Sequence, residues 1–384
     1  MNGFVFNTTR SIVCEAGAAA RLGELCSGLM TAPVLLVTDP GIMKLGLADE
    51  ALAALEAAGL APVVFQDVMA DPEEKAVLSA AALGREHKVG GVIGFGGGSS
   101  MDVAKLAALL LATDQKLEEI YGVGLATGGR LPLVQVPTTA GTGSEVTPIS
   151  IVTTGSHEKK GVVAPQLLPD LAVLDAKLTL GLPPAATAAT GVDAMVHAIE
   201  AYTSKHKKNP LSDMLARQAL QLLAGSIETA VHDGGDAAAR QDMLLGAMLA
   251  GQAFSNAPVA AVHALAYPIG GRFHVSHGLS NSLVLPHVLR FNLPAAAATY
   301  AELAPIIFPT ITPTSPQDMA AAMIEGFEML IPSLGLQTRL GEVGIEAAHV
   351  PMMAEDAMKQ TRLLVNNPRD MSYDDAAAIY SGAL

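Results

Sequence analysis

An acidic residue and an imidazole lie four residues apart in the otherwise apolar stretch GVDAMVHAIE, residues 191–200. Residues i and i+4 of a helix are neighbours on one face, so the side chains of Asp193 and His197 can converge on one point. A hydrogen bond on a helix surface would explain this pair as well as a metal ion would. Further ligand-type residues on apolar segments would favour the metal.

Two more histidines occur in the apolar stretch PVAAVHALAYPIGGRFHVSHG. The pattern predicts that His263 lies in a helix that begins near Pro258 and stops at Pro268, with His277 beyond a glycine turn at residues 270–271. An unpaired buried imidazole or carboxylate is costly, so apolar segments that carry such groups usually supply partners or a metal. One carboxylate and three imidazoles suit Fe²⁺ or Zn²⁺ better than Mg²⁺ or Ca²⁺.

The other histidines lead to different expectations. Spacing alone would allow His274 to replace His277 as a ligand. His206 stands beside three lysines and is expected on the solvated surface, and His287 is expected to be structural.

The glycine-rich stretch GFGGGSSMDVAKLAALLL, residues 94–111, follows a predicted strand and opens a predicted helix. Bare N–H groups at a helix N-terminus can hold a phosphate, and Gly96, Gly97 and Gly98 would let it approach the backbone. The dinucleotide fingerprint is incomplete, because Ser99 stands in place of its third glycine. A tight turn between strand and helix explains the stretch equally well.

Two further features could contact a nucleotide. Asp39 ends the apolar run VLLVTD, where a carboxylate could bind a ribose diol. The stretch PTTAGTGSEVT, residues 137–147, places several hydroxyls after a predicted strand. An ordinary polar loop would have the same composition.

The elements that must position these residues change in character near residue 182. Before it, short β-rich runs alternate with alanine-rich helical patterns, which predicts a parallel α/β sheet with strands at 33–39, 61–65, 89–98 and 131–139. After it, long apolar helical patterns follow Pro183 and Pro184. We therefore expect an α/β nucleotide-binding domain over residues 1–182 and a helical domain over residues 183–384, packed tightly around a cleft.

Composition limits the classes of partner. The chain has 384 residues, half of them hydrophobic, and a net charge of −14, which disfavours nucleic acid and anionic membranes. No stretch approaches the roughly 18 apolar residues of a spanning helix, and MNGFVFNTTR lacks the pattern of a secretory signal. The two cysteines, Cys14 and Cys26, form no CxxC motif, which indicates a reducing cytoplasm.

Over nearly the whole chain, these motifs resemble those of the iron-containing, or group III, alcohol dehydrogenases. GGGSSMD looks like the family's glycine motif and PTTAGTGSE like its cofactor-side loop. GVDAMVHAIEAY resembles its first metal helix, and HALAYPIGGRFHVSHGLSNSLVLPHVLRFN its second metal segment. The resemblance implies an α/β domain with a parallel sheet and an all-α C-terminal domain, the dehydroquinate synthase-like architecture, with metal and nicotinamide in the cleft.

The resemblance also implies roles for individual residues. The ligands of one Fe²⁺ or Zn²⁺ ion would be Asp193, His197, His263 and His277, and not His274. The NAD-binding positions fall on Asp39, Gly96, Gly97, Gly98, Ser99, Ser100, Asp102, Thr138, Thr139, Thr142 and Lys160. The implied activity is hydride transfer between NAD(H) and a small alcohol, or its aldehyde or ketone, in a homodimer or higher homo-oligomer.

Two positions depart from the family pattern. Tyr267 stands where many relatives carry a histidine, one turn after His263, and could pass the proton. A packed aromatic ring with a satisfied hydroxyl explains it as well. Asp71 replaces an asparagine that is frequent in relatives, and could rearrange a hydrogen bond near the nicotinamide.

Two other functions would keep the same motifs. An NAD-using lyase of the dehydroquinate synthase type would need a basic phosphate pocket in the helical domain, where Lys205, Lys207 and Lys208 are the available cations. A non-catalytic scaffold subunit that binds metal and nucleotide would show no turnover.

Overall fold

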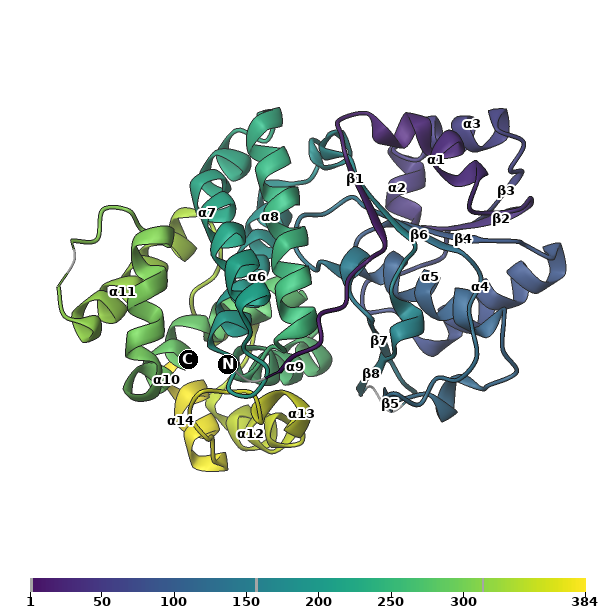
Figure 1. Ribbon diagram of the computed structural model, residues 1–384. Helices are drawn as coiled ribbons and strands as arrows, with labels where there is room; N and C mark the ends of the chain where they lie inside the picture. Colours follow the sequence, from purple (N-terminus) through teal and green to yellow (C-terminus); the bar gives the residue numbers. More distant parts are fainter. Residues whose placement is uncertain (1–2, 156–157, 313) are drawn as a thin grey trace. The chain divides into compact units, whose positions relative to one another are not determined.

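The chain forms two compact units in the computed structural model, which describes residues 3–155, 158–312 and 314–384 (Figure 1). The α/β unit comprises Thr8–Thr139 and Gly143–Leu180. The helical unit comprises Gly181–Leu384, together with Ala140–Thr142 and the segment that ends at Asn7. Two short stretches that precede residue 183 therefore belong with the helical unit.

A parallel sheet forms the centre of the α/β unit. Its strand order is β1-β9-β6-β4-β2-β3, and all its neighbouring strands pair in parallel. The strands are β1 (Ser11–Cys14), β2 (Val34–Val37), β3 (Pro62–Phe65), β4 (Val92–Gly96), β6 (Leu133–Pro137) and β9 (Leu171–Leu174). The four strands expected from the sequence are β2, β3, β4 and β6, so the α/β class is confirmed, whereas β1 and β9 were missed.

Helices cover both faces of this sheet because successive strand residues point to opposite sides. Leu36 of β2 packs in the core with α1, α2 and α3, whereas Leu35 and Val37 pack in the core with α4 and α5. The two layers lie above and below the sheet in Figure 1. The helices are α1 (Leu22–Ser27), α2 (Pro40–Lys44), α3 (Asp49–Ala57), α4 (Glu74–His87) and α5 (Gly98–Leu110).

A second, smaller sheet packs beside α5. Strand β8 (Lys159–Val163) pairs in parallel with β5 (Gly122–Val123) and antiparallel with β7 (Ile149–Thr153). Val152 and Val162 extend from this sheet into the core formed by α4 and α5. This sheet attaches Lys160 to the α/β unit, and it was not predicted from the sequence.

The helical unit is built around α6, which begins at Pro184 with Pro183 as its N-cap, as expected. Most of its side chains from Thr187 to Thr203 are buried, and it packs against α7, α8 and α10. The helices are α6 (Pro184–Thr203), α7 (Pro210–His232), α8 (Ala237–Asn256), α9 (Ala261–Phe273), α10 (His277–Ile307), α11 (Pro316–Ser333), α12 (Val350–Met358), α13 (Thr361–Leu364) and α14 (Tyr373–Gly382).

Helix α9 continues through Pro268, where the sequence predicted a stop. Proline has no N–H to donate to the carbonyl of Ala264, so one helical hydrogen bond is missing. Leu265 and Ile269, on either side of it, are fully buried, and α9 packs against α10 and α12. Tertiary packing therefore overrides the local preference.

The turn after α9 also differs from the expectation. It begins at His274, whose positive φ of 56° ends the helix, and not at the glycines of residues 270–271, which lie inside it. His277 is consequently the first residue of α10.

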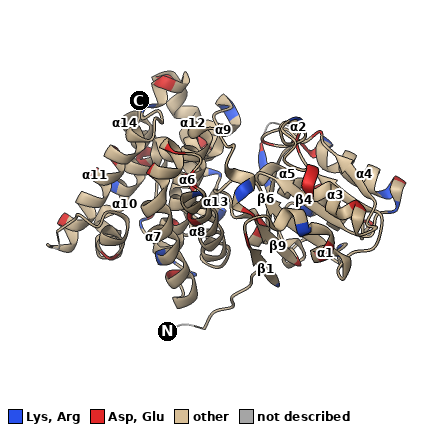
Figure 2. Cartoon of the chain, turned by 90° about the horizontal axis from the view of Figure 1, so that it is seen from above, with Lys and Arg blue, Asp and Glu red and all other residues tan. Residues whose placement is uncertain are grey.

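The surface is mixed in charge. Figure 2 shows acidic and basic residues interspersed along both units, within a net charge of −14. Among the described residues, no helix is both long enough and apolar enough to cross a membrane.

Candidate metal centre and cofactor site

Three helices of the helical unit bring four ligand-type side chains together. Helix α6 supplies Asp193 and His197, α9 supplies His263, and α10 begins with His277; one ligand atom from each lies within 4.8 Å of the others. The Nε2 atoms of His277, His263 and His197 are 3.6, 3.8 and 4.0 Å from Oδ1 of Asp193. Ligand atoms at about 2.1 Å from a tetrahedral metal would be about 3.4 Å apart, so these atoms surround a space of nearly the right size.

His263 gives the clearest sign that the group fits a metal. Its Nδ1 lies 2.7 Å from Oε2 of Glu200, which assigns the proton to Nδ1 and leaves Nε2 with a lone pair. That Nε2 is buried and has no hydrogen-bond partner among the described residues. A buried acceptor without a partner is costly, and a metal ion would satisfy it.

Glu200 fixes both the ring of His263 and the start of its helix. Its carboxylate accepts hydrogen bonds from the backbone N–H groups of Ala260, at 2.9 Å, and Val262, at 2.7 Å. The N-cap of α9 makes no side-chain cap of its own, so Glu200 takes that role from α6. Sequence reasoning missed Glu200; its signal was a carboxylate on the same apolar helix, three residues after His197.

Asn281 and Gly278 hold the start of α10 against α6. The fully buried Asn281 donates from Nδ2 to Oδ1 of Asp193 at 2.6 Å, and Nδ2 also lies 3.3 Å from Nε2 of His277. A Cβ on Gly278 would lie 2.3 Å from the carbonyl oxygen of Ala189, so only glycine allows this approach. Both residues place His277 beside Asp193, and both were missed from the sequence.

The electrostatics of the cluster suit a cation. Burial would raise the pKa of Asp193, but the three imidazoles and Asn281 outweigh it and lower the pKa below its usual value. Burial lowers the pKa of His197 to about 3, with the other two imidazoles acting in the same direction, so this ring is neutral near pH 7. An ionised carboxylate with neutral imidazoles is the protonation state that metals require.

The remaining histidines lie outside this cluster. His274 is exposed at the C-cap of α9, so the structure brings His277 to the ligand group and leaves His274 out. His206 is exposed, as expected. His287 lies half-buried on α10, where burial lowers its pKa.

Tyr267 lies one helical turn after His263 in α9. Its ring centroid is 6.2 Å from that of His277. The tyrosine therefore faces the ligand cluster from the same helix that supplies His263.

In the α/β unit, Asp39 and Gly96 lie together where the strand order reverses. The chain passes from β2 to β3 on one side and then to β4 on the other side of β2. Such a switch point is where nucleotides bind in open α/β sheets. Asp39 follows β2, and its Oδ2 lies 3.4 Å from the place that a Cβ on Gly96 would occupy. Gly96 has φ +148°, so glycine is required there.

The glycine turn leads directly into helix α5. Gly97 is the N-cap and makes no side-chain cap, and Gly98, Ser99 and Ser100 form the first turn. The first N–H groups of a helix have no partner within it, so those of α5 are available to an anion at the carboxyl end of β4. The other carboxylate oxygen of Asp39, Oδ1, caps α2 by accepting from the N–H of Ile42 at 3.0 Å.

Asp102 is placed differently from the other candidates. Its carboxylate accepts hydrogen bonds from Oγ of Ser144, at 2.7 Å, and from the N–H of Ile151, at 2.8 Å. Both oxygens therefore bond to the protein itself. Burial raises the pKa of Asp102, while the charge of Lys105 and the two hydrogen bonds oppose that effect.

The remaining candidates lie on two further segments. Thr138 and Thr139 follow β6, and the N–H of Thr138 donates to the carbonyl of Gly96 at 3.0 Å. Thr142 belongs to the short segment assigned to the helical unit. Lys160 lies on β8 with its Nζ 5.6 Å from the ring centre of Tyr121.

The carboxylate of Asp71 neutralises a lysine, which an asparagine at this position could not do. Asp71 adopts φ 51°, and its carboxylate lies 2.6 Å from Nζ of Lys159. The Lys159 side chain is 8% exposed and the Asp71 side chain is 39% exposed, so water reaches this ion pair from the side of Asp71. Lys159 therefore supplies a counter-charge to Asp71, the residue that departs from the family pattern.

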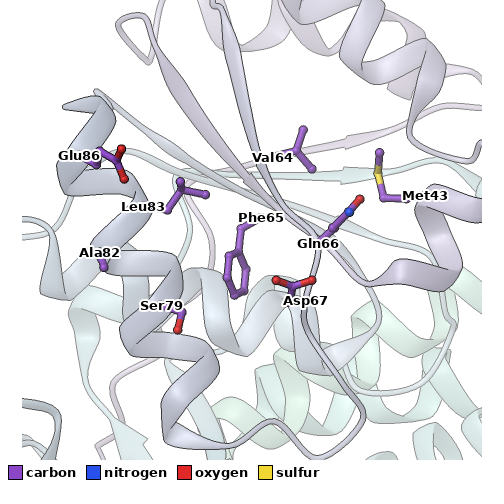
Figure 3. Close-up of a pocket in the computed structure, with 9 residues that line it drawn as sticks. All are labelled: Met43, Val64, Phe65, Gln66, Asp67, Ser79, Ala82, Leu83 and Glu86. Atoms are coloured by element: carbon purple, nitrogen blue, oxygen red, sulfur yellow. The ribbon is translucent and has the colours of Figure 1, made fainter.

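A pocket of about 650 Å³ lies at the edge of the large sheet, between β3 and α4 (Figure 3). Phe65 and Leu83 supply apolar surface, and Asp67 and Glu86 supply carboxylates. None of the candidate metal or cofactor residues lines it, so it takes no part in either site.

Known proteins match the chain along almost its full length. Residues 9–176 match the family described as iron-containing alcohol dehydrogenase, and residues 187–384 match the description Fe-containing alcohol dehydrogenase family, C-terminal. The chain is 39% identical over 356 residues to long-chain-alcohol dehydrogenase 1 of Geobacillus thermodenitrificans (strain NG80-2), covering 91% of this chain and 89% of that protein.

Solved structures show the same architecture. The crystal structure of 1,3-propanediol oxidoreductase aligns over 100% of both chains with a TM-score of 0.96 and 34% identity. Sulfoacetaldehyde reductase from Bifidobacterium kashiwanohense, solved in complex with NAD⁺, has a TM-score of 0.89 at 28% identity and covers 100% of this chain and 99% of its own. The dehydroquinate synthase-like fold class is therefore confirmed.

Replacing Glu200 by glutamine should weaken metal binding. The amide keeps the size of the side chain but loses one acceptor oxygen, so the ring of His263 and the start of α9 cannot both be held. Loss of such an outer partner costs about 10- to 100-fold in metal affinity. Titration of the metal-free protein with Zn²⁺ measures this directly. Glu328→Gln, which alters an exposed carboxylate paired with Arg290, is the matched control; equal affinity in Glu200→Gln and wild type would contradict the role.

Proposed function

Because the chain belongs to the family of iron-containing alcohol dehydrogenases, we propose that Asp193, His197, His263 and His277 hold the metal of an NAD-dependent alcohol oxidoreductase. The enzyme transfers a hydride between an alcohol, or its aldehyde or ketone, and NAD(H). The observation that carries the residue assignment is the convergence of four ligand atoms, one of which is the buried Nε2 of His263. Within the described part of the chain, this nitrogen has no hydrogen-bond partner. Iron is the first choice of metal, and the same ligand set admits zinc.

The chain's own residues prepare this site for the reaction. Glu200 keeps Nε2 of His263 free for a ligand bond by holding the proton on Nδ1, and Asn281 orients Asp193. When bound, the divalent ion supplies Lewis-acid activation of the substrate oxygen and NAD⁺ accepts the hydride. Phe254 stacks on the ring of His197 with a centroid separation of 4.3 Å, which shields that ligand from water.

The α/β unit supplies all of the proposed NAD-binding residues except Thr142, which belongs to the helical unit. We assign Asp39 to the adenosine ribose, the first turn of α5 to the pyrophosphate, and Thr138, Thr139, Thr142 and Lys160 to further cofactor contacts. Asp102 supports the site through its bonds to the protein. Residues 1–182 would thus bind NAD, and residues 183–384 would hold the metal.

Two of the three lysines that a lyase would need are paired with carboxylates. Lys205 pairs with Asp370 at 2.6 Å, and Lys208 pairs with Asp213 at 2.7 Å. This pairing favours the dehydrogenase over a lyase with a basic phosphate pocket.

We also propose a cytoplasmic homodimer or higher homo-oligomer. Two cysteines without a CxxC motif support a reducing compartment. Exposed apolar side chains such as Phe4 and Val5, 43% and 77% exposed, support contacts with another copy. Light scattering of the purified protein measures its oligomeric state.

His263→Ala tests the metal assignment. Removing one of four ligands should lower metal affinity by more than about 100-fold, the upper end of the loss caused by removing a residue that only hydrogen-bonds to a ligand. Activity should fall with the metal content. Metal analysis of the purified variant measures the occupancy. His274→Asn, which changes the nearby exposed histidine to a residue that tolerates positive φ, should keep its metal. Full occupancy and activity in His263→Ala would refute the assignment.

Tyr267→Phe tests the proposed proton relay. If the hydroxyl passes the proton of the alcohol, turnover should fall about 10²-fold, the usual effect of losing an acid–base group. Metal content should stay the same, because the tyrosine is not among the ligands. An unchanged pH–rate profile in this variant would leave packing as the only role of Tyr267.

Asp39→Gly tests the choice of NAD over NADP. The carboxylate can accept hydrogen bonds from both ribose hydroxyls, whereas a 2′-phosphate there would meet like charge. Lys44, the nearest cation along the chain, lies in the last turn of α2. The variant should therefore gain NADP use more than it loses NAD use. The ratio of kcat/KM for the two cofactors measures this, and an unaltered ratio would exclude Asp39 as the selector.

A further inference from the structure

The segment from Ser144 to Ile151 joins the parts of the chain that carry the remaining proposed cofactor residues. Thr138 lies shortly before it, and Lys160 lies after it on β8. The segment packs on α5, the helix whose first turn forms the proposed pyrophosphate site. Its position relative to α5 therefore sets the spacing of these cofactor contacts.

Two charged residues on one face of α5 hold this segment. Lys105 donates from Nζ to Oγ1 of Thr147 at 3.1 Å and to the carbonyl of Ile149 at 2.7 Å. Asp102, one turn earlier, accepts from Ser144 and Ile151, as described above. The two side chains thus bind the segment near both of its ends and in its middle.

This arrangement is costly in a core. Lys105 is 0% exposed, and Glu145, whose charge acts on it together with that of Asp102, is 2% exposed. Burial lowers the pKa of Lys105 to about 8, against the two carboxylates, and burial raises the pKa of Glu145 to about 7. Apolar residues of similar volume commonly stabilise a core as well as buried charges do, or better. The ammonium therefore requires an explanation beyond stability.

We propose that Lys105 is a positioning residue of the NAD(H) site, whose ammonium fixes the segment 144–151 against α5 and so sets the geometry of the cofactor contacts on either side. The inference rests on the proposed function, because it assumes that this unit binds NAD(H). Lys105 itself does not touch the cofactor; it acts through Thr147 and the carbonyl of Ile149.

Without the ammonium, the segment loses the donor to two of its acceptors. The hydroxyl of Thr147 and the carbonyl of Ile149 would then be left without this donor in a buried place, and the segment would shift to find new partners. A shift of the segment 144–151 would displace the neighbouring cofactor contacts and so lower the affinity for NAD⁺. The metal ligands belong to other elements and would stay in place.

Lys105→Met tests the proposal, because methionine fills a similar volume without a donor. The Kd for NAD⁺, measured by calorimetry on the metal-loaded enzyme, should rise about tenfold or more. The KM for NAD⁺ should rise with it, and kcat should change less. Thr147→Val should also raise the Kd for NAD⁺, whereas Thr147→Ser should keep the wild-type Kd. In the double variant Lys105→Met with Thr147→Val, the loss of binding free energy should be smaller than the sum of the two single losses.

Val103→Ala is the matched control, because it removes buried apolar volume from the same helix and leaves Lys105 and Asp102 unchanged. If Val103→Ala weakens NAD⁺ binding as much as Lys105→Met at an equal loss of Tm, the effect of Lys105 is merely structural and the proposal fails. An unchanged Kd in Lys105→Met would also overturn it. A wild type that does not bind NAD⁺ would instead refute the proposed function, so the two failures are distinguishable.

Discussion

The helical unit brings one carboxylate and three imidazoles together, with Asp193, His197 and His263 buried and the His277 side chain 32% exposed. The cost of burying the first three groups is the constraint on which the site depends. Near pH 7 Asp193 is ionised and His197 is neutral, so the carboxylate supplies a negative charge and this imidazole supplies a lone pair to the group. A divalent cation completes such a group. The surrounding structure keeps the four ligand atoms close, and no side chain or backbone group of the described residues hydrogen-bonds to the lone pair of His263.

That arrangement links three helices through a few contacts. Glu200 extends from α6 to the start of α9, where it caps the helix and orients His263. Gly278 lets α10 approach α6, and Asn281 ties the first turn of α10 to Asp193. A similar arrangement occurs in the α/β unit, where Lys105 and Asp102 of α5 hold the segment 144–151 by hydrogen bonds. In both units, a buried polar side chain on one element sets the position of another.

The α/β class could be predicted from the sequence, because strand periodicity is a local property. Residue type and spacing brought out Asp193, His197 and His263 as candidate ligands, whereas the choice of His277 over His274 followed from the family resemblance. Glu200 could not be predicted, since two of its partners are main-chain N–H groups at a helix start 60 or more residues away, which carry no side-chain signal. The same holds for Lys105, whose acceptors include the carbonyl of Ile149. Local rules also placed a helix end at Pro268, where burial on both sides overrides the proline.

The central claim is that one metal ion lies among Asp193, His197, His263 and His277. X-ray diffraction data collected at the iron absorption edge from crystals of the iron-loaded protein test it most directly. We expect a single strong anomalous peak about 2.0–2.2 Å from one carboxylate oxygen of Asp193 and from Nε2 of each histidine. A peak at another position, or coordination that omits His263, would contradict it.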